Sequence, residues 1–215
     1  MRSLSLCSAL ISVAGFVLLC FATPALAVDG VLEINQTCAV QAGCFAGDTP
    51  GFPVTISASG SYQLTSGLQV PNADTTAVEI QTGDAALDLN GFRILGPSTV
   101  GTGVRIYAPL PAATKDGIVV KNGLVFGMGD GGILLPGQSA ARVENMHVIS
   151  NKGLGIRVGG SSVVSGSIVR NNTGVGIQFD TGSKVTDNVV VTNAGVGFRG
   201  APDLSRAIVS RSTPE

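Results

Sequence analysis

Three arginines and one glutamine recur at matching places along the chain. Arg157, Gln178 and Arg199 follow one another at a constant interval, and Arg105 occupies the corresponding place in an earlier segment. An arginine donates paired hydrogen bonds to a carboxylate, and a glutamine amide adds further polar contacts. One row of these side chains on a surface predicts a groove for an acidic sugar polymer. An ordinary solvated face is the alternative, and the residue types alone favour it.

The chain has a single histidine, His147. At the same interval it aligns with Ile168 and Val189, beside an inward column, so we expect it to point outward among apolar neighbours. A catalytic imidazole needs a partner, and Glu144 and Lys121 are the candidates by position. Nothing in the sequence fixes their distance, and a structural or incidental histidine is favoured. The apolar outward column, which continues at 149 and 191, suggests cover by a loop such as 107–115 or by a second subunit.

Residues 1–27 are predicted to be a signal peptide. Arg2 gives a charged start, residues 10–21 are apolar, and residues 25–27 read Ala-Leu-Ala, a small-residue cleavage site. We expect cleavage after Ala27, a secreted or periplasmic location, and no membrane span in the remaining chain. Cys38 and Cys44 then remain, close enough to close a small loop, and an exported compartment favours a disulfide between them. Two free thiols or half a metal site are the alternatives.

Composition points to short strands and tight turns. Glycine accounts for 30 of 215 residues, charged residues for 13%, and tryptophan is absent. The residues after the signal suit one domain. The formal net charge of −1 gives no argument for a nucleic-acid partner.

A repeat of constant length organises the second half of the chain. Its columns are Val143/Val164/Val185, Val148/Val169/Val190, Asn151/Asn172/Asn193, Gly155/Gly176/Gly197 and Ile156/Ile177/Phe198. Residues 120–135 join with a shift of two, and residues 87–106 join once the insertion 107–115 is set aside. The glycine and asparagine density interrupts any helical period, and leucine is too scarce for leucine-rich repeats. Three short strands per turn remain.

Stacking explains why the sequence repeats. Alternation in Ile156-Arg157-Val158 puts aliphatic side chains inside and polar ones outside. Successive turns lie about 4.8 Å apart, so each inward residue covers its counterpart and a continuous core forms. We expect the asparagine column at a bend, bonded along its own ladder, and the glycine column at a cramped corner.

The stretch LDLNGFRILG at 87–96, followed by N-x-V-x-x-N-x-x-x-G-[IF] at 188–198, resembles right-handed parallel β-helix proteins of the pectin-lyase-like class. The resemblance implies an all-β solenoid of about seven turns over residues 53–210. Residues 28–52, with the Cys38/Cys44 loop, would form an N-terminal cap, and residues 211–215 a tail. The cap region resembles that of exported β-helix proteins of undefined activity.

The resemblance leaves the activity open. Polysaccharide lyases of this fold gather several carboxylates around calcium, and its glycosidases use close carboxylate pairs. Here Asp116, Asp130, Asp180 and Asp187 lie on different turns, and no Met/His cluster suits a soft metal. We therefore expect no cofactor or metal, and a non-catalytic surface protein that binds an extended polysaccharide or cell-envelope component. A polysaccharide lyase or glycoside hydrolase is the alternative, and a homo-oligomer through the apolar sheet is a further expectation.

Overall fold

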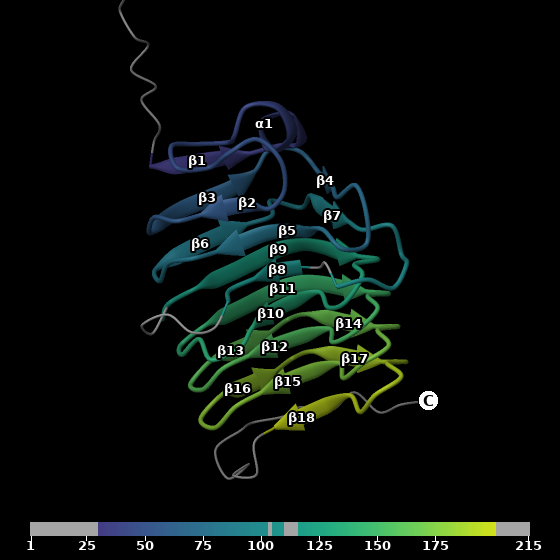
Figure 1. Ribbon diagram of the computed structural model, residues 1–215. Coiled ribbons are helices and arrows are strands. Elements are labelled where there is room, and N and C mark those ends of the chain that lie inside the picture. Colours follow the sequence, from purple (N-terminus) through teal and green to yellow (C-terminus); the bar gives the residue numbers. More distant parts are fainter. Residues whose placement is uncertain (1–29, 103–104, 110–115, 201–215) are drawn as a thin grey trace, which may run out of the picture.

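The computed structural model describes residues 30–102, 105–109 and 116–200 (Figure 1). The chain winds into a parallel β-helix with three walls. The first wall follows the order β1 (Val31–Ile34), β3 (Gly60–Leu64), β6 (Ala85–Asp88), β9 (Val119–Phe126), β11 (Arg142–Ile149), β13 (Val163–Ser165) and β16 (Lys184–Thr186). β9 and β11 are long enough to continue around a bend into the second wall.

The second and third walls complete each coil. In addition to the second halves of β9 and β11, the second wall contains β4 (Leu68–Gln69), β7 (Arg93–Leu95), β14 (Ile168–Arg170) and β17 (Val189–Val191). The third wall contains β2 (Val54–Ile56), β5 (Thr76–Ile80), β8 (Arg105–Tyr107), β10 (Ile133–Leu135), β12 (Ile156–Val158), β15 (Ile177–Phe179) and β18 (Phe198–Gly200). The seven strands of this wall mark about six coils of the solenoid, slightly fewer than the seven coils expected from the sequence.

The predicted core columns are confirmed. Val143, Val164 and Val185 pair in register and are 0%, 0% and 1% exposed. The column that begins at Val148 pairs in the same way and stays buried down to Val190, which is 7% exposed. The expected two-residue shift between β9 and β11 is also present, since Val120 pairs with Val143. Like side chains therefore stack into one apolar core.

The asparagine ladder sits at the bend between the second and third walls. Asn172 accepts hydrogen bonds from the backbone N–H and the side-chain amide of Asn151, and its own amide donates to Asn193 Oδ1 at 2.9 Å. The following glycines are needed for close approach, because a Cβ at Gly176 would lie 2.4 Å from Val190 Cγ1. The ladder and the glycine column thus hold successive coils at one spacing.

The corner between the first and second walls needs a left-handed backbone. The residues with positive φ there are Asn90, Gly91, Asn122, Asn145, Gly166 and Asp187. Asparagine, aspartate and glycine are the residues that tolerate this conformation best. These residue types at the bend therefore allow each coil to turn from the first wall into the second.

A short helix at the N-terminal end was not expected from the sequence. α1 (Gln36–Gln41) begins after Asn35, whose Oδ1 accepts the Cys38 N–H at 2.9 Å as an N-cap. The predicted disulfide is confirmed, with Cys38 and Cys44 joined at an S–S distance of 2.05 Å. In Figure 1 this helix and loop lie over the first coils, at the end of the stack.

The predicted signal peptide, most of the 107–115 insertion and the tail 211–215 lie outside the described residues. Among those that are described, no helix is long and apolar enough to cross a membrane.

Candidate functional site

The predicted polar row on the third wall is only partly present. Arg157, Gln178 and Arg199 pair in register on β12, β15 and β18. Arg105 was wrongly placed in this row, because Leu134 of β10 pairs with Tyr107. The backbone of Arg105 instead pairs with Thr76, next to a register irregularity at Thr76/Val78. The constant interval of the later repeats does not extend through this coil, which carries the insertion.

The surroundings of the row weaken it as a continuous basic surface. Arg199 is exposed, whereas Arg157 and Gln178 are half-buried. The Nε atom of Arg157 is buried and has no hydrogen-bond partner. On the N-terminal side of Arg157, the same row holds the buried Leu134, then Tyr107, then Glu79. The basic part of the row is therefore confined to β12, β15 and β18.

His147 is exposed on the second wall and aligns with Ile168 and Val189, as expected. The proposed partners of its imidazole bind other groups. The Glu144 carboxylate accepts from Arg142 Nη2 at 2.6 Å, and Lys121 Nζ lies 3.4 Å from the Asp88 carboxylate. These contacts lie on the first wall, and none is with His147.

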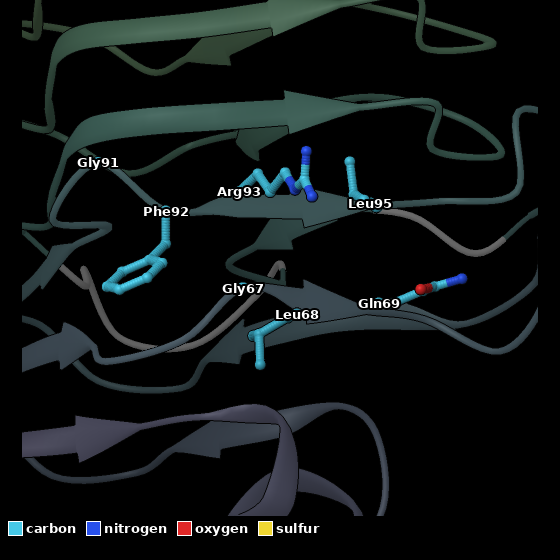
Figure 2. A pocket seen from close by; sticks show the side chains of 7 residues that line it. All are labelled: Gly67, Leu68, Gln69, Gly91, Phe92, Arg93 and Leu95. Atoms are coloured by element: carbon cyan, nitrogen blue, oxygen red, sulfur yellow. The ribbon is translucent and has the colours of Figure 1, made fainter.

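A groove that the sequence did not indicate runs across β4 and β7 (Figure 2). Its volume is about 520 Å³, and its lining consists of Gly67, Leu68, Gln69, Gly91, Phe92, Arg93 and Leu95. A second hollow of about 400 Å³ adjoins it and is lined by Gln36, Gly67, Gln69, Val70 and Pro71. Because Gly67 and Gln69 line both, the two form one surface from β7 to the start of α1, which we call the β4/β7 groove.

Strand pairing and α1 fix the geometry of the β4/β7 groove. Gln69 pairs with Leu95 across β4 and β7. The Gln36 side chain bridges from α1 to the Gln69 backbone, since its Oε1 accepts the Gln69 N–H at 2.8 Å and its Nε2 donates to the Gln69 carbonyl at 3.3 Å. β4 and β7 approach closely at Gly67, where a Cβ would lie 3.2 Å from the Arg93 carbonyl oxygen.

The groove places polar donors beside apolar side chains. Arg93 and Gln69 are exposed donors, and Phe92 and Leu95 are half-buried apolar contacts. In Figure 2 Phe92 points from the start of β7 toward β4, and the Arg93 guanidinium lies on the opposite side of β7. Neither lining contains a carboxylate. A glycosidase needs two carboxyl groups beside the scissile bond.

Among the residues that the structure covers, no group of three or more His, Cys, Asp or Glu side chains could hold a metal ion.

Comparisons with known proteins give one result. A family model described as a right-handed beta helix region matches residues 56–203. Searches of curated proteins and of solved structures found no match. The matched segment spans every coil from β3 to β18, and the strand pairs are those of a parallel β-helix. The chain therefore belongs to the right-handed beta helix family.

Proposed function

We propose that the protein is a non-catalytic surface protein that binds an extended carbohydrate of the cell envelope in the β4/β7 groove. The observation that carries this proposal is the lining itself, with exposed donors beside apolar side chains and no carboxylate. Sugars present hydroxyl edges to polar groups and apolar faces to rings such as that of Phe92. The Arg93 guanidinium adds a preference for acidic residues of the polymer.

The groove extends beyond one hollow, because Gly67 and Gln69 line both hollows. The Gln36 bridge fixes the Gln69 backbone before any ligand binds. Such preorganisation reduces the entropy lost on binding. An extended chain that crosses β4 and β7 would contact Arg93 at one end and Pro71 at the other.

Binding and turnover are tested together on pectate, alginate and chitin-type polymers. Affinity is measured by calorimetry, and turnover is measured as new reducing or unsaturated ends. We expect binding without turnover, and Arg93→Ala should weaken binding of an acidic polymer about tenfold, the effect of losing one charge-assisted hydrogen bond. Arg199→Ala is the matched control on the third wall. If Arg199→Ala weakens binding and Arg93→Ala does not, the site is the arginine row instead.

An enzyme remains the second candidate because of two carboxylates on the first wall. Asp88 and Glu144 pair with Lys121 from opposite sides, on β6 and β11. Two strand spacings put their backbones roughly 10 Å apart, and the carboxyl groups of inverting glycosidases lie about 6.5–9.5 Å apart. Any turnover that is abolished by Asp88→Asn or Glu144→Gln, but not by Arg93→Ala, would replace binding with catalysis.

We also propose that the protein is exported from the cytoplasm. The Cys38–Cys44 disulfide is compatible with an extracellular location. We infer export with cleavage after Ala27. N-terminal sequencing of the protein from the medium or periplasm should begin at Val28, and recovery of an intact N-terminus from the cytoplasm would contradict it.

A further inference from the structure

The outer surface of the second wall carries mostly apolar side chains over five consecutive strands. Two outward columns run along the solenoid, and strand register places their members one above another. They are Arg93, Leu124, His147, Ile168 and Val189 in the first, and Leu95, Phe126, Ile149, Arg170 and Val191 in the second. We call this surface the second-wall strip.

The strip combines partly exposed apolar side chains with two exposed arginines and an exposed histidine. Its seven apolar residues are half-buried except Val189, which is 42% exposed. Arg93, His147 and Arg170 are exposed, and neither column contains Asp or Glu. On the first wall, in contrast, Lys121 and Arg142 are paired with Asp88 and Glu144. The strip therefore joins apolar side chains to arginines without a carboxylate, on a chain whose net charge is −1.

The size and charge of the strip argue against a second copy of the chain. Four strand spacings give a length of about 19 Å, and two columns give an area on the order of 300 Å². A stable protein interface needs about 800 Å² per partner. Two copies placed face to face would also bring arginines near arginines without any carboxylate in the strip to offset them.

We propose that the second-wall strip docks on the surface of an anionic lipid bilayer. All five strands belong to one sheet, so the apolar side chains reach the interface together while Arg93 and Arg170 contact lipid phosphates. His147 lies between them on β11. This inference goes beyond carbohydrate binding and does not depend on it, although Arg93 and Leu95 belong to both surfaces. The test therefore leaves these two residues unchanged.

The full chain is tested by co-flotation with vesicles of phosphatidylglycerol and phosphatidylcholine, and with vesicles of phosphatidylcholine alone. The readout is the ratio of the two partition coefficients, compared between variants, because the N-terminal residues with the charged Arg2 are the same in all of them. We expect a ratio well above one. Arg170→Gln should lower it about fivefold, the effect of one arginine near an anionic surface. The double variant Ile149→Thr/Ile168→Thr should lower binding to anionic vesicles by at least as much.

Matched controls make comparable substitutions on the other two walls. Arg199→Gln alters an exposed arginine of the third wall, and Val163→Thr alters an outward residue of the first wall. Neither should change partition. A ratio of one in the wild-type chain, or equal losses in the controls, would overturn the proposal. So would a dimer, seen by sedimentation, that Ile149→Thr/Ile168→Thr dissociates. Polymer affinity of the strip variants should stay unchanged, so a failed lipid test leaves the carbohydrate proposal standing.

Discussion

Tyr62 on β3 stands out among the described residues because the fold clearly alters its acid–base behaviour. Its side chain is 1% exposed, its hydroxyl donates to the Ala58 carbonyl at 2.6 Å, and its ring lies 5.0 Å from that of Phe45. Burial raises the pKa of the hydroxyl above its ordinary value of 10.0. The folded state therefore favours the neutral phenol. Its contribution to stability is complete below the ordinary pKa and falls as the pH rises toward the folded pKa.

Tyr62→Phe should consequently separate two effects. At pH 7 the loss of the hydrogen bond to Ala58 lowers the free energy of unfolding by about 1 kcal/mol. Above pH 10 the variant should lose less stability than the wild type, because no phenol remains to ionise in the core. Urea unfolding at both pH values measures the loss of stability in each protein. Tyr107 is unchanged in the variant, so its ionisation contributes equally to both. Parallel alkaline losses would assign the effect to other groups.

Asn172 offers a test of the ladder. It is 1% exposed, accepts the Asn151 N–H at 3.0 Å and donates to the Val148 carbonyl at 3.1 Å. Asn172→Ala leaves two buried Asn151 donors without an acceptor, so the free energy of unfolding should fall by about 3 kcal/mol. Thr173→Ala, at the exposed neighbour, should change it by less than about 0.5 kcal/mol. Equal effects in denaturant titrations would mean that the ladder does not hold the coils.

At the scale of elements, an uninterrupted period made the fold predictable. Columns from Val143 to Phe198 repeat without a gap, so strand register followed from counting. Where coils vary in length, counting fails, and Arg105 was placed in the wrong row for that reason. α1 has only six residues and depends on the Asn35 cap rather than on an apolar period. The β4/β7 groove arises between a two-residue strand and its neighbour, which no motif marks.

The strand β15 tests the assignment of inside and outside. Ile177 is 0% exposed and Gln178 is half-buried on the outer side. Ile177→Asp should unfold several coils, because an unpaired carboxylate would enter the apolar stack at a cost of several kcal/mol. Gln178→Asp should leave the far-UV circular dichroism spectrum nearly unchanged. Similar spectral loss in both variants would show that the faces are assigned wrongly.

At the scale of the whole molecule, stability is a sum over neighbouring coils. Each coil contacts chiefly the coil before and after it, and the stack from β12 to β18 repeats at a constant interval. At the N-terminal end, Asp48 attaches the disulfide loop to the third wall, since its carboxylate accepts the N–H groups of Cys44 and Thr55 at 2.8 and 2.9 Å. These two hydrogen bonds hold the disulfide loop against β2 at this end of the stack.

Deleting one whole coil tests this architecture directly. Removal of residues 156–176 joins Gly155 to Ile177 and brings Val143 over Val185, and Val148 over Val190. The shortened chain should fold with its β-sheet spectrum intact and a lower free energy of unfolding, by the contribution of one coil and its interface. The slightly shorter deletion 156–175 shifts every later strand by one position, so core valines would face water. We expect that chain to lose the structure beyond Gly155, as seen by hydrogen exchange and circular dichroism. If both deletions fold equally well, vertical register does not determine the stack.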